Sequence, residues 1–173
     1  MEKFLKIIGI TLSALFFVYL ALPGPEFPAP LSDSTQSQEK ADQETPLRRA
    51  YFTNFPRQEV VDYYREVFSK TAFGLTLPSV RLNYPPEEAQ TLIRDQARST
   101  FLEEIVHPFR ESIYINGFEP KDPKDDVWYK GVDFRQKLII KHNPSSVLVR
   151  IPIAAITIFA AYFLVKEWLY GEA

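Results

Sequence analysis

Two apolar segments lie at the two ends of this chain, and most of its charged residues lie between them. The first runs from Phe4 to Leu22, and the second runs from about Val147 to Tyr170. A bilayer admits only segments of ~20 apolar residues that satisfy their own backbone hydrogen bonds. The pattern therefore predicts transmembrane helices at residues 1–22 and 147–170, flanking one polar domain.

The first segment has the features of an uncleaved signal anchor. Residues 7–22 carry no charge, Lys3 and Lys6 precede them, and Pro23 ends the helix. A cleaved signal peptide is the alternative, but Tyr19 would then occupy a position that favours small residues. We therefore expect this helix to stay attached to the chain.

The second segment is short for a membrane span, because only residues 151–165 are free of charge. Arg150 and Lys166 flank this stretch, and Trp168 and Tyr170 lie where an interfacial aromatic belt is expected. Its apolar residues point in nearly every helical direction, as in a helix that faces lipid. A helix buried in a soluble domain is the alternative interpretation.

The basic residues beside the first helix predict the orientation in the membrane. Lys3 and Lys6 precede that helix, and basic residues accumulate on the cytoplasmic side. Basic residues before the second helix favour the opposite orientation, but the first helix usually decides. We expect a two-pass protein of the cell membrane with both termini in the cytoplasm and an extracytoplasmic central domain.

Composition excludes several classes of function. The formal net charge of −2, with mixed signs, argues against nucleic-acid binding, which usually needs a basic surface. The absence of cysteine excludes disulfides, thiolate zinc sites and cysteine nucleophiles. The sequence shows no nucleophile motif and no glycine-rich phosphate loop, and we expect no cofactor.

The polar part of the chain divides into a linker and one α+β domain. Residues 23–46 are rich in Pro, Ser, Gln and acidic residues, which is typical of a disordered linker. Residues 47–143 predict the order β-α-β-α-β-β, with a three- to four-stranded sheet, two helices on one face and a final antiparallel hairpin. The expected strands are 49–55, 75–84, 111–118 and 127–141, and the expected helices are 57–70 and 87–107.

The second predicted helix brings candidate metal ligands together. Glu103 and His107 would lie one turn apart, at a spacing that can share a metal ion, with Glu104 beside them. His142 is the only other histidine. These residues suggest a membrane-bound, metal-dependent hydrolase as an alternative function, whereas a histidine at a helix C-terminus is the structural interpretation.

Two arginines on the same predicted helix form a candidate anion site. Arg94 and Arg98 would share a face and clamp an anion or a partner's carboxylate. A small-ligand sensor that closes over such an anion is a third hypothesis. A solvated helix face with local ion pairs is the alternative.

The domain has fewer than a hundred residues and cannot bury all of its aromatic side chains. Some of them are therefore expected on an exposed binding patch. Tyr63, Trp128 and Tyr129 are the candidates, because each lies off the predicted core face. Isolated surface aromatics are the alternative. The residue patterns identify no family, and the leading hypothesis is a non-enzymatic, membrane-anchored protein that binds a partner protein or envelope component.

Overall fold

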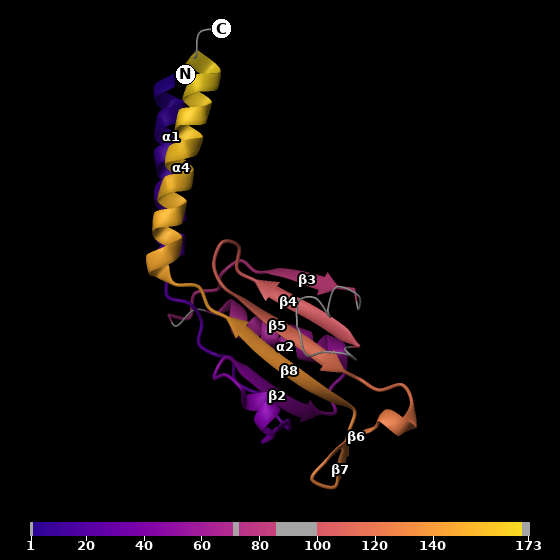
Figure 1. Ribbon diagram of the computed structural model, residues 1–173. Coiled ribbons are helices and arrows are strands. Elements are labelled where there is room, and N and C mark those ends of the chain that lie inside the picture. The colour runs from indigo at the N-terminus through magenta and orange to yellow at the C-terminus, as the bar shows by residue number, and fades with distance from the viewer. Residues whose placement is uncertain (1, 71–72, 86–99, 171–173) are drawn as a thin grey trace. The chain divides into compact units, whose positions relative to one another are not determined.

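The computed structural model describes residues 2–70, 73–85 and 100–170 (Figure 1). The chain divides into two compact units. One unit comprises the terminal segments Met1–Pro23 and Ser145–Ala173, and the other comprises Gly24–Pro144.

The terminal unit is a pair of antiparallel helices, α1 (Glu2–Ala21) and α4 (Val147–Tyr170), which contact each other (Figure 1). Arg150 of α4 joins them: its Nε donates to the Leu20 carbonyl at 2.7 Å and its Nη2 donates to the Leu22 carbonyl at 2.8 Å. The last carbonyls of a helix have no donor within the helix, and a cation there also suits the helix dipole. The buried Arg150 side chain therefore caps α1 and ties it to α4.

One helix in the described part of the chain, residues 147–168 of α4, is long and apolar enough to cross a membrane. At 1.5 Å per residue it spans about 33 Å, against ~30 Å for a hydrocarbon core. The apolar part of α1, Lys6–Ala21, is shorter and spans about 24 Å. The predicted pair of membrane-spanning helices is therefore supported only for α4.

The second unit is an α+β domain, as predicted, built on an antiparallel sheet of six strands instead of three to four. The strand order is β1-β2-β8-β5-β4-β3, and every neighbouring pair is antiparallel. The strands are β1 (Thr35–Gln36), β2 (Arg48–Thr53), β3 (Val80–Tyr84), β4 (Phe101–Val106), β5 (Ser112–Phe118) and β8 (Gln136–Asn143). The expected antiparallel pairing of the last two predicted strands is confirmed for β5 and β8, but the connection between them contains two further short strands as well as the charged loop.

Helix α2 (Arg57–Ser69) covers one face of this sheet, at nearly the predicted bounds. Its buried side chains recur with helical spacing, as in Val60, Tyr64 and Phe68, and so form one apolar stripe. Alternate residues of the strands meet this stripe, because side chains along a strand point to opposite faces. The main core consists of Leu31, Tyr51, Val60, Val61, Tyr64, Phe68, Phe101, Ile105, Ile113, Ile115, Leu138 and Ile140.

The predicted single strand at 127–141 is divided into three. A hairpin of β6 (Val127–Tyr129) and β7 (Val132–Phe134) precedes β8. Lys130 and Gly131 connect the two short strands with φ of 52° and 79°, as in a two-residue type I′ turn. The glycine permits this turn, and the short 3-10 helix η2 (Pro123–Asp125) lies in the charged loop before it.

The prediction of a helix over 87–107 is wrong for its last part, because residues 101–106 form strand β4. Residues 86–99 lie outside the described part of the chain, so the rest of that prediction stays untested. The segment FLEEIV lacks the alternation of a half-exposed strand, because five of its six residues are buried and the last is partly buried. When both faces of a strand are buried, its sequence does not alternate between apolar and polar residues, so the two-residue period of a strand cannot be recognised.

The structure also differs from the predicted disordered linker at 23–46. Strand β1 pairs with β2, the 3-10 helix η1 (Lys40–Gln43) follows it, and Leu31 is buried in the main core. The Ser37 backbone N–H donates to the Ala50 carbonyl at 2.9 Å. A few apolar residues and backbone pairing thus hold a segment whose composition suggested disorder.

Candidate functional site

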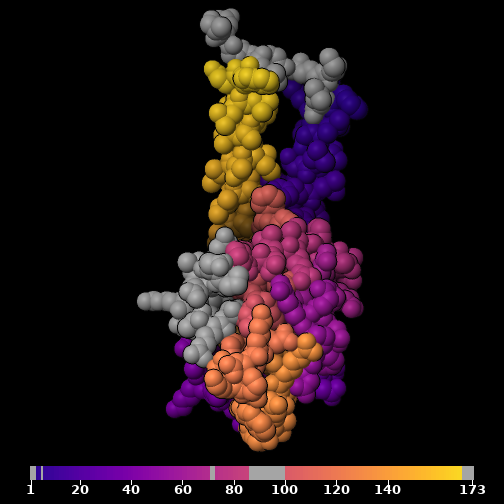
Figure 2. All heavy atoms as spheres, turned by 90° about the vertical axis from the view of Figure 1, so that its right-hand side faces the viewer, coloured from indigo at the N-terminus to yellow at the C-terminus, as the bar shows by residue number. Residues whose placement is uncertain are grey.

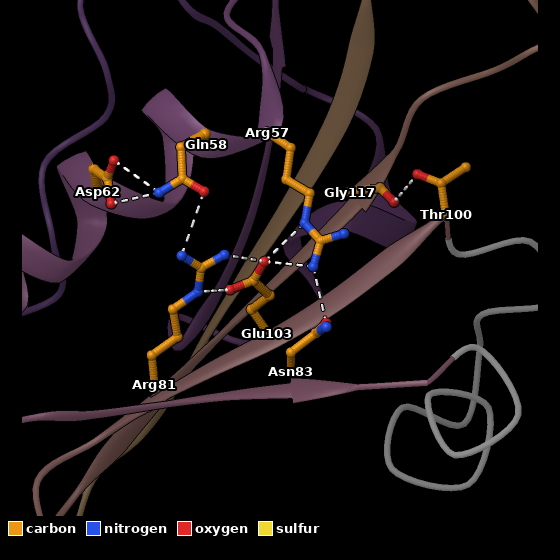
Figure 3. Close-up of polar contacts among 8 residues, drawn as sticks. All are labelled: Arg57, Gln58, Asp62, Arg81, Asn83, Thr100, Glu103 and Gly117. Carbon is orange, nitrogen blue, oxygen red and sulfur yellow. Dashed lines mark hydrogen bonds and ion pairs between the residues drawn. The ribbon is translucent and has the colours of Figure 1, made fainter.

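A charged cluster lies around Glu103, where strands β3 and β4 meet the start of α2 (Figure 3). The Glu103 side chain is fully buried. Arg57, the first residue of α2, donates from Nε to Glu103 Oε1 at 2.7 Å. Arg81 of β3 donates from Nη2 to the same oxygen at 2.7 Å and from Nε to Oε2. Two guanidinium groups thus share one carboxylate, and the three groups carry a net charge of +1.

The two arginines of this cluster have further partners. Arg57 Nη2 donates to Asn83 Oδ1 at 2.8 Å, and the guanidinium lies 4.9 Å from the centre of the Phe101 ring. Arg81 Nη1 donates to Gln58 Oε1 at 3.4 Å, and the Glu103 hydrogen bond raises the pKa of Arg81. The network fixes the start of α2 to the sheet edge and occupies both carboxylate oxygens of Glu103.

Glu104 points to the opposite face of the sheet, because neighbouring residues of a strand alternate. Its Oε2 accepts a hydrogen bond of 2.5 Å from the Tyr84 hydroxyl. The Tyr114 ring lies 6.3 Å from the Tyr84 ring, and burial together with the Glu104 charge raises the pKa of Tyr114. Both tyrosines pack against the buried Leu102 and form a small second cluster on this face.

A second buried polar cluster lies at the turn between β4 and β5. The His107 ring stacks on Phe68 with ring centres 4.4 Å apart, and its Nδ1 lies 3.2 Å from Glu111 Oε1. Arg110 Nη2 lies 2.9 Å from the same oxygen. His142 of β8 meets Phe68 edge-on, and burial lowers its pKa below the ordinary value, so its imidazole is neutral at neutral pH.

The predicted metal ligands Glu103, Glu104 and His107 do not converge. The prediction assumed a helix, in which residues four apart are neighbours, whereas four residues along a strand span about 13 Å. Across the ranges that the structure describes, no group of three His, Asp or Glu side chains is placed to hold a metal ion. His142 instead joins His107 around Phe68.

Of the predicted binding residues, Arg94 and Arg98 lie outside the described residues. Tyr63 is half-buried, and its hydroxyl donates to the Pro30 carbonyl at 2.9 Å, so it fastens the preceding segment to α2. The Tyr129 ring stacks on Phe52 with ring centres 4.2 Å apart. These two aromatics are engaged within the domain.

Trp128 differs from the other two predicted aromatics, because the residue is 63% exposed. Tyr129 and Phe134 lie on one face of the β6–β7 hairpin, and Trp128 lies on the other. The centre of the Phe134 ring is 5.7 Å from the centre of the Phe52 ring. Figure 2 shows this part of the chain, in orange, at the end of the domain. The stacked rings hold the hairpin on β2 and leave the indole outward.

Sequence reasoning missed Arg57, Arg81 and Glu111 as members of polar clusters. Arg57 and Glu103 are 46 residues apart, and Arg81 and Glu103 are 22 apart. Only strand register brings them together, so no local pattern signals the contact.

No family model matches the chain, and neither the curated proteins nor the solved structures contain a match.

Proposed function

We propose that this chain is a non-enzymatic, membrane-anchored protein whose extracytoplasmic domain binds a partner protein or an envelope component through Trp128. Helices α1 and α4 form the membrane anchor, and both termini lie in the cytoplasm. The length and apolar composition of α4 support the anchor, and the cap that Arg150 places on α1 supports insertion of the two helices as a pair.

The observation that carries the binding function is the exposed Trp128 on a fixed hairpin. Tryptophan is enriched among residues that dominate protein interfaces, because its large surface is buried with little loss of conformational freedom. The aromatic stack of Phe52, Tyr129 and Phe134 orders the hairpin before any partner arrives. A preordered site loses less entropy on binding.

The ionisable clusters support binding over catalysis. The Glu103 carboxylate is enclosed by two guanidinium groups, and Glu111 is held by Arg110 and His107. A buried carboxylate that is held by ion pairs inside the domain is poorly placed to take a proton from a substrate. Both clusters instead serve to position elements of the fold.

Replacement of Trp128 by alanine is expected to weaken binding of the partner about thirtyfold or more, because hot-spot residues each contribute about 2 kcal/mol or more. The full chain is purified from its native membrane in mild detergent, and co-purifying proteins are quantified. Lys124→Ala, in the neighbouring loop and with an 88% exposed side chain, is the matched control. A partner recovered equally with both variants, or a chain that purifies alone, contradicts the proposal.

A single cysteine at Lys124 is expected to react with a membrane-impermeant maleimide in intact cells, whereas a cysteine at Lys3 reacts only after permeabilisation. The natural chain has no cysteine, so each variant carries one thiol. The readout is mass-tagging of the full chain on a gel. Labelling of Lys3→Cys but not Lys124→Cys in intact cells shows that the orientation is reversed.

A further inference from the structure

Exposed apolar side chains gather at one end of the domain. Phe109 is 77% exposed and lies in the β4–β5 turn, and Phe73 is 72% exposed and follows α2. Leu75 and Val80 are also exposed. Val80 pairs with Val106, directly before the β4–β5 turn, so the segment that leads into β3 lies at the same end.

Helix α2 runs toward this end of the domain. Phe68, in its last turn, stacks on His107 beside the β4–β5 turn, and Ser69 Oγ lies 3.0 Å from Ser79 Oγ. The backbones of Lys70 and Thr76 form an isolated antiparallel β-bridge. The loop that carries Phe73 and Leu75 is therefore held beside the β4–β5 turn.

Both chain ends of the domain lie at this same end. Gly24 packs on Glu111, since a Cβ at Gly24 would lie 3.3 Å from Glu111 Oε2. Asn143, at the end of β8, pairs with Ser112. The covalent chain of four steps from Asn143 to Val147 spans at most about 14 Å. A bilayer that contains α4 is thus within reach of this end of the domain.

The turn itself holds Phe109 outward. The Arg110 N–H donates to the His107 carbonyl at 2.9 Å, and the His107 N–H donates to the Glu111 carbonyl at 2.9 Å. Phe109 has φ of 61°, a left-handed conformation that is unfavourable for a bulky side chain. Such strain persists where the surrounding structure enforces it and often marks a functional position. The buried contacts of His107, Arg110 and Glu111 enforce it here.

We propose that this end of the domain docks on the lipid surface, with the Phe109 ring inserted at the level of the headgroups and Phe73 and Leu75 beside it. The proposal rests on the proposed membrane anchor. Aromatic rings are favoured at membrane interfaces, and apolar side chains at the tip of a rigid turn add binding in proportion to the apolar area that they bury. The β6–β7 hairpin, which carries Trp128, lies at the other end of the domain from the β4–β5 turn (Figure 1), so Trp128 would face away from the bilayer.

Quenching of tryptophan fluorescence by brominated lipids tests this proposal. The full chain carrying Phe109→Trp, Trp128→Phe and Trp168→Phe is reconstituted into phosphatidylcholine and phosphatidylglycerol vesicles, with and without bromine on the acyl chains. We expect at least twofold quenching of Trp at position 109. Phe73→Trp in the same background, expected to be quenched as well, gives a second position on the same end.

The two native tryptophans separate failure of this inference from failure of the membrane anchor. Trp168 alone, in Trp128→Phe, reports insertion of α4 and is expected to be quenched. Trp128 alone, in Trp168→Phe, is expected to be unquenched. Quenching at Trp168 without quenching at positions 109 and 73 overturns the docked domain but retains the anchor, and the absence of quenching at all positions overturns both.

Discussion

Substitution of Gly117 by alanine is expected to destabilise the domain by about 3 kcal/mol, the upper part of the range for overpacked cores. Gly117 of β5 lies directly opposite Phe101 of β4. A Cβ at Gly117 would lie 2.1 Å from two ring atoms of Phe101, far inside van der Waals contact. The ring covers the glycine as part of the main core.

Neither partner of this contact can withdraw easily. The Gly117 carbonyl accepts hydrogen bonds from the Thr100 hydroxyl at 2.7 Å and the Thr100 N–H at 3.0 Å (Figure 3). The Phe101 ring is held under the Arg57 guanidinium. Both the backbone and the ring would have to shift to admit one methyl group.

The double variant Gly117→Ala with Phe101→Val tests this explanation. Phe101→Val alone leaves a cavity and costs about 2–3 kcal/mol, but it removes the ring atoms that meet the new methyl group. We expect the double variant to be more stable than the sum of the two effects by roughly 2 kcal/mol. Urea unfolding of the full chain in mild detergent, followed by near-ultraviolet circular dichroism, measures the difference.

Glycine in a strand is usually less favourable than alanine by about 0.5–1 kcal/mol, because its unfolded state has more freedom. A Gly117→Ala variant as stable as the natural chain, with additive effects in the double variant, would show that the Phe101 ring moves aside without cost.

Elements with a strong apolar period were predictable from the sequence. The stripe of Val60, Tyr64 and Phe68 marks α2 because one face of that helix is buried and the other is solvated. Strand β8 alternates in the same informative way, with Leu138 and Ile140 on the core side. In α2, and at Leu138 and Ile140 of β8, the apolar positions coincide with the buried positions.

Strand β4 was not predictable, because its polarity does not report its burial. Glu103 and Glu104 are both buried, one against the arginines and one against Tyr84. A carboxylate in a sequence is ordinarily a surface residue, and only a distant partner changes this. The expected convergence of Glu103, Glu104 and His107 was wrong for the same reason, because it assumed that this segment is a helix.

The candidate binding site was partly predictable. The exposure of Trp128 follows from its place off the core face, but nothing in the sequence separates it from Tyr63 and Tyr129, which the fold engages. Tyr129 stacks on Phe52, and the Tyr63 hydroxyl donates to the Pro30 carbonyl. Both partners lie in other parts of the chain, so the sequence near each tyrosine does not indicate the contact. Phe109 was not proposed as exposed, because its position depends on the positive φ of one turn residue.

The second large effect is expected for Glu103→Gln, which should destabilise the domain by about 3 kcal/mol, because a buried ion pair that loses one partner costs about 3–5 kcal/mol. The amide retains the shape of the carboxylate but accepts fewer hydrogen bonds and carries no charge. Arg57 and Arg81 would face each other without their shared counter-ion. Their side chains are 36% and 28% exposed, so water offsets part of the repulsion, and the lower end of the range is expected.

The neighbouring carboxylate supplies the matched control. Glu104→Gln makes the same chemical change one residue along the same strand, but its carboxylate accepts a hydrogen bond from Tyr84 and no arginine contact is found among the described residues. The amide oxygen can still accept that bond, so the expected loss is only about 1 kcal/mol. Urea unfolding of both variants in mild detergent, at low and at high salt, compares them. Equal losses for Glu103→Gln and Glu104→Gln would show that the two arginines do not require the Glu103 charge, whereas a larger loss for Glu103→Gln that shrinks at high salt identifies guanidinium repulsion as the cause.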